Sequence, residues 1–247
     1  GAHFVHTHIP ASQALNELLD PKRNRGSLTI TEGSTLSDIR KALSITTITQ
    51  EKKIVAKPYL ANKYASIEGQ LFPATYSFAP GTTSNEALTA MITKFHDIAV
   101  QTELIKGYQK YSPYEVLTIA SMVQIEGDPS DYAKVSRVIY NRLKIGMPLQ
   151  LNSTVQYAAN LRGRIALSRN ATKIQSPYNT YTHTGLPPTP ISNPGEAAIK
   201  ASLNPVEGNW LYFITVKPHD TRFTNDFALF QEWVTMYNNN LANGAFK

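Results

Sequence analysis

The strongest constraint on the fold is a mostly apolar segment at residues 112–127, SPYEVLTIASMVQIEG, that ends in an acid. Ser112 is a typical N-cap, Pro113 stands at the first helical position, where its missing N–H costs nothing, and Gly127 ends the pattern. The segment therefore predicts a core helix that carries a carboxylate, Glu126, at its C-terminal end.

The surroundings of Glu126 in the sequence favour a protonated carboxyl. A helix C-terminus disfavours an anion, and the apolar neighbours Val123 and Ile125 add desolvation, so both effects raise the pKa. Residues 132–195 contain no acid but many amides and hydroxyls. Glu126 thus suits a general acid acting on a neutral polar substrate such as a sugar chain. A helix-terminal salt bridge to a nearby Arg or Lys is the open alternative.

The composition excludes several classes of protein. The 247 residues include no cysteine, which excludes disulfides, thiol nucleophiles and cysteine-ligated zinc. No apolar run approaches the roughly 20 residues that a membrane-spanning helix needs. The net charge of +6 favours a polyanionic partner, or reflects only a solvated basic surface.

The order of patterns predicts an α+β protein in two parts. Residues 1–50 show a strand, helix, strand, helix order at 3–9, 11–19, 27–30 and 31–44, and are expected to form a small module. Residues 51–247 are expected to form a larger mixed α/β domain. Its predicted helices lie at 84–100, 113–126, 131–146, 153–161, 195–205 and 227–239, and its buried strand at 209–216.

Two proline- and glycine-rich segments are predicted to be loops. Residues 67–84 form a loop rich in aromatics, and residues 176–195 hold five prolines and two glycines. A long irregular segment of this kind inside a domain is usually functional. The chain enters its first strand-like pattern directly after Gly1, so we expect that an upstream segment has been removed.

The common catalytic signatures are missing. The sequence has no GxGxxG, Walker, GxSxG or HExxH motif, and His3, His6 and His8 read as a solvated cluster near the chain end. We therefore expect neither a metal nor a cofactor. Ordinary glycosidases use two carboxylates, and none of the other acids forms an obvious pair with Glu126 in sequence. The candidates are Glu68, Asp128, Asp131 and Asp226. A mechanism with one carboxylate is therefore worth considering.

Five ordered blocks carry a resemblance to a known family. They are EGQLFPATY, IASMVQIEG, VIYNRLKIGMPLQLNSTVQYA, SPYNTYTHTGLPPTPISNPGEAAIKA, and LYFITV followed by FTNDF. From about Ser27 onward the chain resembles the YceG-like family of endolytic murein transglycosylases. The resemblance implies cleavage of the MurNAc-β-1,4-GlcNAc bond within peptidoglycan strands, leaving 1,6-anhydroMurNAc ends without consuming water.

The resemblance also assigns roles to residues. It places the catalytic acid, which then acts as base, on Glu126, while Gln124 stands where the family pattern has a further acid. We expect substrate-binding residues at Gln150, Asn152, Ser153, Thr154, Tyr178, Asn179, Thr180, Tyr181 and Asn225. We expect Glu68, Gln124 and Asp226 to support them. Family members often carry Asp at the position of Asn152, so a charged role is in doubt there.

The family further implies an N-terminal membrane anchor and a LysM-like module, whose later half resembles residues 27–44. The expected location is the extracytoplasmic face of the bacterial inner membrane. The expected partners are peptidoglycan strands and, through coupling to wall synthesis, peptidoglycan synthases, with no nucleic acid. Three alternatives stay open: a non-catalytic wall-binding protein, an ordinary two-carboxylate hydrolase, and a nucleic-acid binder, which only the charge suggests.

Overall fold

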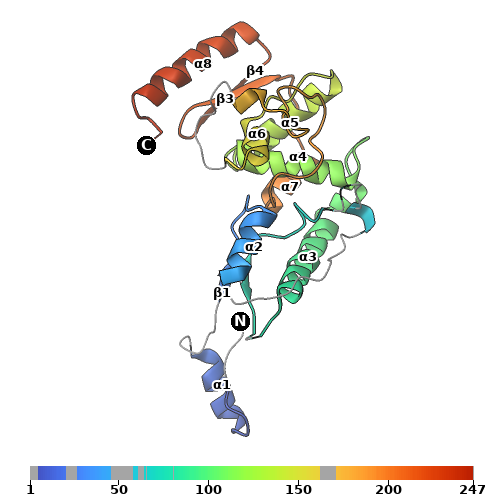
Figure 1. Cartoon of the computed structure of the whole chain (residues 1–247), viewed down its shortest axis with the longest axis vertical. Helices are drawn as coiled ribbons and strands as arrows, with labels where there is room; N and C mark the ends of the chain where they lie inside the picture. The colour runs from blue at the N-terminus through green and yellow to red at the C-terminus, as the bar shows by residue number, and fades with distance from the viewer. Residues whose placement is uncertain are drawn as a thin grey trace.

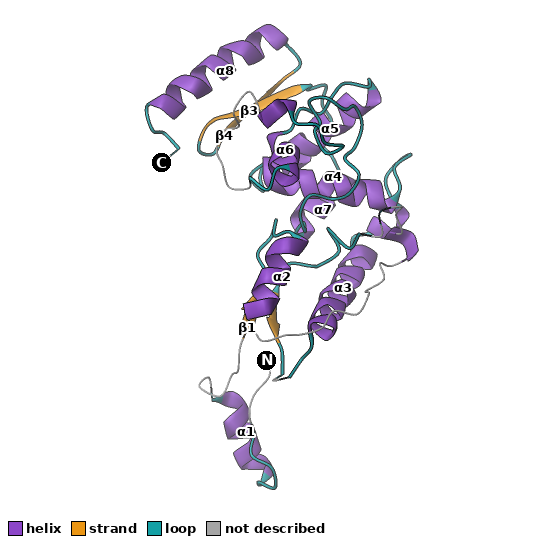
Figure 2. Cartoon of the chain, in the orientation of Figure 1, coloured by secondary structure: helices purple, strands orange, loops and turns teal. Residues whose placement is uncertain are grey.

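The structure is a computed structural model that describes residues 5–20, 27–45, 58–60, 64, 66–79, 81–161 and 171–246. Its long axis runs from helix α1 (Ala11–Leu19) at one end to helix α8 (Phe227–Ala242) at the other (Figure 1). Helices predominate, and the strands form two separate, short antiparallel pairs (Figure 2). Short 3-10 segments occupy Pro58–Leu60, Leu104–Lys106 and Ala171–Lys173.

Helix α4 (Pro113–Glu126) lies at the centre of the molecule. Its residues from Val116 to Val123 are all buried. Val116 and Leu117 belong to one hydrophobic cluster, whereas Ile119 and Met122 belong to another, so α4 separates the two cores. A helix that is apolar on nearly every side is stable only when it is enclosed in this way. The predicted core helix is confirmed.

The ends of α4 form as its sequence predicts. The Ser112 hydroxyl accepts a hydrogen bond from the N–H of Glu115, whose carboxylate in turn accepts from the N–H of Ser112, a capping box. Pro113 occupies the first turn, and the N–H of Gly127 closes the last turn on the carbonyl of Val123. Both ends are therefore fixed, which sets the position of Glu126.

Three further helices pack around α4. They are α5 (Tyr132–Lys144), α6 (Asn152–Ala158) and α7 (Glu196–Leu203). Each was predicted, and residues 176–195 contain no helix or strand, as expected. This loop is tied to α4, because the Ser121 hydroxyl accepts the N–H of Ile191 at 3.0 Å and the Ser121 carbonyl accepts the Ser192 hydroxyl at 2.9 Å.

A smaller lobe lies on the side of α4 that faces α1 (Figure 1). It contains β1 (Ser27–Thr29), α2 (Leu36–Ile45), β2 (Thr75–Ser77) and α3 (Ser84–Gln101). The two strands pair antiparallel, and residues of 30–43 share one hydrophobic cluster with residues of 67–92. Packing therefore crosses residue 50. The division there stays a prediction, since residues 46–57 lie outside the described part.

The structure corrects two local predictions and confirms a third. Residues 5–9 form no strand, so the expected strand at 3–9 is wrong over its described part. The loop predicted at 67–84 contains β2, which is too short for an alternating pattern to stand out between prolines. The helix at 11–19 is confirmed, but Leu15, Leu18 and Leu19 are exposed. The mixed α/β class is confirmed, whereas the likeness of the first module to LysM stays a prediction.

The C-terminal part is a β-hairpin covered by a helix. Strands β3 (Tyr212–Lys217) and β4 (Asp220–Thr224) pair antiparallel, and α8 packs on β3. The strand predicted as buried is mostly half-buried, with only Val216 fully buried. The hairpin is attached to α5 by side chains that donate to carbonyls: Asn141 to Trp210 at 2.9 Å, and Arg142 to Leu211 at 2.6 Å.

None of the helices in the described ranges is long and apolar enough to cross a membrane.

The buried side-chain amide of Asn193 joins the smaller lobe to the loop at 176–195. The Asn193 Oδ1 accepts the N–H of Leu71 at 2.8 Å, and its Nδ2 donates to the Ser34 carbonyl at 2.9 Å and to Glu68 Oε1 at 3.1 Å. The backbone N–H of Asn193 also donates to the Ser34 carbonyl, and its own carbonyl accepts the N–H of Gly33. Three chain segments therefore meet at one residue.

We expect Asn193→Ala to lower the free energy of unfolding by roughly 2–4 kcal/mol, because it leaves the buried Leu71 N–H and the Glu68 carboxylate short of a partner. Chemical denaturation measures the change. Asn204→Ala is the matched control, since Asn204 is exposed and its Nδ2 donates only to the Lys200 carbonyl of its own helix. Equal effects of the two substitutions would contradict the role given to Asn193.

Candidate active site

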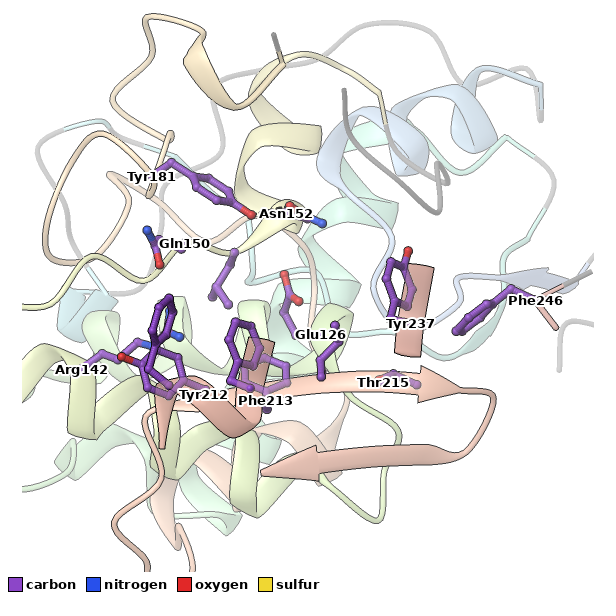
Figure 3. A pocket seen from close by; sticks show the side chains of 14 residues that line it. Glu126, Arg142, Gln150, Asn152, Tyr181, Tyr212, Phe213, Thr215, Tyr237 and Phe246 are labelled. Carbon is purple, nitrogen blue, oxygen red and sulfur yellow. Dashed lines mark hydrogen bonds between the residues drawn. The ribbon is translucent and has the colours of Figure 1, made fainter. Parts of the chain in front are cut away.

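A cavity of about 480 Å³ lies where the C-terminal ends of α4 and α5 face α6, β3 and α8. Glu126 lies in its middle, with Tyr181 and Asn152 on one side and Tyr212 and Phe213 on the other (Figure 3). We call this space the Glu126 cavity. Its lining residues are Glu126, Arg142, Gln150, Leu151, Asn152, Tyr181, Tyr212, Phe213, Ile214, Thr215, Phe227, Phe230, Tyr237 and Phe246.

Glu126 is held from the first turn of α6. Its Oε1 accepts the backbone N–H of Ser153 at 3.1 Å. The Ser153 hydroxyl is also close enough to favour the charged carboxylate, although it makes no hydrogen bond of ordinary geometry within the described residues. The α6 backbone therefore fixes one carboxylate oxygen of Glu126.

The pKa of Glu126 is raised above that of an ordinary glutamate, and burial is the main cause. The Ser153 contacts and the positive charge of Arg142 oppose this rise without cancelling it. By accessible surface Glu126 is only half-buried, because it faces the cavity. Desolvation nevertheless dominates, because the surrounding protein atoms displace much of the water that would otherwise hydrate the carboxylate. The carboxyl is thus biased toward its protonated form.

Arg142 is the cation of the cavity wall. It is 6% exposed, and its guanidinium donates to the carbonyls of Leu211 and Leu149, each at 2.6 Å. It also lies 5.5 Å from the ring centroid of Tyr212, a cation–π distance. Burial lowers the pKa of Arg142, and the neighbours Tyr212, Tyr181 and Glu126 counter that shift. A guanidinium stays charged in this setting, so Arg142 is a fixed positive charge near the carboxyl.

Three of the expected substrate-binding residues line the Glu126 cavity. The Tyr181 hydroxyl donates to Asn152 Oδ1 at 2.6 Å, and burial raises the pKa of Tyr181 to about 12, so it remains a neutral donor. Gln150 has a φ of 50°, a left-handed conformation that few side chains adopt. Its N–H donates to the Thr180 carbonyl at 3.0 Å, which holds this strained residue at the rim.

The other expected residues do not line this cavity. Thr154, Asn179 and Thr180 are buried and fix the loop; the two threonine hydroxyls bond each other at 2.9 Å. The Tyr178 hydroxyl bonds that of Thr189, and its ring packs on Tyr157, which does not line the cavity either. Asn225 is exposed away from the cavity. Ser153 reaches the site through its contact with Glu126.

The three residues expected to support the site have different contacts, and none of them lines the Glu126 cavity. Gln124, on α4, donates to the Tyr132 hydroxyl at 2.7 Å and accepts the N–H of Gly195 at 2.9 Å, so it braces the C-terminal end of α4. Glu68 is 3% exposed and accepts from the N–H of Leu36 and the hydroxyl of Tyr157. Asp226 caps α8 by accepting the N–H groups of Ala228 and Leu229.

Sequence reasoning missed the aromatic wall of the cavity. Phe227, Phe230 and Tyr237 of α8 lie on one helical face by their spacing, and β3 adds Tyr212 and Phe213. The helical period of residues 227–239 was a signal that could have revealed this face. Arg142 could not be found from the sequence, because nothing in its spacing distinguishes it from the other basic residues.

In the part of the chain that the structure describes, no group of three or more His, Cys, Asp or Glu side chains is arranged to hold a metal ion.

Comparison with known proteins defines the family. The sequence profile of the YceG-like family matches residues 1–236, and the chain therefore belongs to the YceG-like family, as its motif blocks suggested. A protein of Bacillus subtilis (strain 168) named endolytic murein transglycosylase is 34% identical over 220 residues, which are 80% of this chain and 61% of that protein. A Streptococcus pneumoniae protein of the same name is 38% identical over 154 residues, which are 60% of this chain and 28% of that protein.

A solved structure supports the fold. The crystal structure of a protein from Listeria monocytogenes described as yceG-like superposes with a TM-score of 0.71 at 27% identity. The match covers 83% of this chain and 75% of that one. The present chain therefore spans about three-fifths or less of the curated relatives named above, but most of the solved one.

We expect Glu126→Gln to raise the thermal midpoint at pH 8. Because the folded-state pKa of Glu126 is raised, the folded protein resists ionisation, whereas the unfolded chain ionises above about pH 4.3. The wild type therefore loses stability as pH rises through this region, and the neutral amide does not. Calorimetry at pH 4 and pH 8 measures the difference, which should shrink at the lower pH.

Glu232→Gln, on the exposed face of α8, is the control, and we expect no comparable gain from it. If Glu126→Gln were the less stable protein at pH 8, the carboxylate would be held ionised by a compensating partner, as in the salt-bridge alternative.

Proposed function

We propose that this chain is the catalytic part of an endolytic peptidoglycan lytic transglycosylase. It cleaves the MurNAc-β-1,4-GlcNAc bond within glycan strands and leaves 1,6-anhydroMurNAc ends. The observation that carries the proposal is one desolvated carboxyl, Glu126, in an aromatic-walled cavity with amide and hydroxyl groups at its rim. The names of the Bacillus and Streptococcus relatives support the same substrate. The proposed site of action is accordingly the bacterial envelope.

A second catalytic carboxylate has no candidate among the residues that line the cavity. The Asp226 carboxylate caps α8, and Glu68 is buried in contacts that join the smaller lobe to α6. Asp128 bonds His219 at 2.9 Å, and Asp131 lies 3.8 Å from the Lys134 ammonium. None of the four lines the Glu126 cavity. Because hydrolytic glycosidases need two carboxylates across the bond, a reaction with one requires a nucleophile from the substrate.

In the proposed reaction Glu126 is the only protein group that donates or accepts a proton. The protonated carboxyl donates its proton to the glycosidic oxygen, and the C1–O bond breaks to give an oxocarbenium-like species, which the substrate's own N-acetyl group helps to stabilise. The Glu126 carboxylate then accepts the proton of the C6 hydroxyl as O6 bonds to C1. Glu126 is again protonated, and no water is consumed.

The surroundings of Glu126 suit both proton transfers, the one in which it is the acid and the one in which it is the base. Burial favours the acid at the start, whereas the Ser153 N–H and the Arg142 charge stabilise the carboxylate once the proton has left. Asn152 and Tyr181 present polar groups to sugar hydroxyl and acetyl groups. The rings of α8 and β3 offer faces on which sugar rings pack.

The test is a digest of purified glycan strands, read by mass spectrometry, with wild type and Glu126→Gln. We expect internal fragments ending in anhydroMurNAc from the wild type, and a loss of at least about a thousandfold in rate with the variant, because both proton transfers depend on this carboxyl. Hydrated reducing ends would contradict the proposal. Binding without cleavage by the wild type would favour a wall-binding protein.

The pH dependence tests the acid role. Because Glu126 must start protonated, we expect kcat/KM to fall as pH rises through its raised pKa. Arg142→Gln removes a charge that lowers this pKa, so the alkaline limb should move to higher pH, whereas Arg142→Lys should leave it close to the wild type. A lower rate with an unmoved limb in Arg142→Gln would assign Arg142 a purely structural role.

A further inference from the structure

A second cavity, of about 500 Å³, lies beside the N-terminal half of α4. We call it the distal cavity. Its wall includes Tyr64, Lys110, Tyr111, Tyr114, Leu186 and Pro188. Leu186 and Pro188 belong to one of the family's motif blocks. The proposed chemistry uses none of these residues, so the distal cavity needs its own explanation.

The two cavities are built on the same elements. Glu115 lines the distal cavity and Glu126 the other, so α4 separates them by about 16 Å at 1.5 Å per residue. The adjacent residues Leu143 and Arg142 of α5 line one cavity each. The loop at 176–195 likewise lines both, with Tyr181 at one and residues 185–188 at the other. A ligand a few sugar rings long can span this separation.

The Tyr111 ring in the wall of the distal cavity is firmly backed. The ring of Tyr111 lies 5.1 Å from that of Tyr140, which is 5% exposed, and Tyr108 packs on the same ring at 5.2 Å. Lys110 is exposed, with its ammonium 5.5 Å from the Tyr111 ring centroid. Aromatic faces fixed in this way lose little entropy when a ligand packs on them.

The lining chemistry fits a saccharide. Sugar rings present C–H faces that pack on tyrosine and proline, and hydroxyl, acetyl and carboxylate groups that accept hydrogen bonds from an ammonium. The Tyr114 hydroxyl is buried beside this cavity without a hydrogen-bond partner among the described residues. A buried hydroxyl without a partner is costly, and a polar ligand group can relieve that cost.

From this arrangement we infer that the distal cavity is a second saccharide subsite, which binds the same glycan strand several rings away from the bond over Glu126. The inference rests on the proposed function for the identity of the strand. It gives endolytic cleavage a physical basis, because a strand end too short to reach the distal cavity forgoes part of the binding free energy.

The experiment measures binding, so that it does not depend on cleavage. Glu126→Gln is titrated calorimetrically with an unbranched peptidoglycan disaccharide, too short to reach both cavities, and with a dodecasaccharide, alone and with Tyr64→Ala and Lys110→Ala added. Both residues are exposed, so the fold should survive, which the thermal midpoint checks. Lys94→Ala, an exposed lysine on α3, is the charge-matched control.

We expect the added substitutions to weaken dodecasaccharide binding roughly tenfold and to leave disaccharide binding within about twofold, while Lys94→Ala changes neither. Unchanged dodecasaccharide binding would overturn the subsite. An effect seen only with strands that carry stem peptides would also overturn it, since the cavity would then bind peptide. If wild type fails to cleave but this length-dependent loss appears, the subsite stands and the proposed reaction fails.

Discussion

The burial of α4 is the constraint on which the rest of the structure depends. Its apolar residues face two cores at once, so the helix cannot shift or rotate without exposing one of them. A capping box fixes one end, and Gln124 braces the other against α5 and α7. Glu126 is the last residue of this helix. A carboxyl therefore stands at the border between core and cavity, in a position that packing determines.

The electrostatics of Glu126 follow from that position. A charged carboxylate at the edge of a core loses hydration, and the loss exceeds what one backbone N–H and one neighbouring guanidinium return. A Glu126 carboxylate with full hydrogen-bond and charge compensation would stay ionised and could not donate a proton. Without any compensation, the carboxyl would be too costly to ionise. The partial compensation by Ser153 and Arg142 leaves a group that can both give and take a proton, as the single-carboxylate mechanism requires.

The elements that could be predicted from the sequence are those whose structure is determined by residues close together in the chain. The caps of α4, the periodicity of α5 and the prolines of residues 176–195 each specify their own structure, and those predictions are confirmed. The pairing of β1 with β2, nearly fifty residues apart, left no local signal. The same reason explains why Thr154, Asn179 and Thr180 were expected in the groove: their polarity predicted contact with a ligand, but long-range packing buries them. Arg142 and the α8 aromatics reach the cavity through the fold of the hairpin onto α5.

The central claim is that one carboxylate suffices because the substrate supplies the nucleophile. The most direct measurement is a digest of glycan strands in water enriched in heavy oxygen, with the new fragment ends weighed by mass spectrometry. Transfer to the C6 hydroxyl predicts ends that carry no heavy oxygen and lack the mass of one water. One heavy oxygen at each new C1 end would contradict this account, because it would show that water attacks C1 and that a second base has to exist.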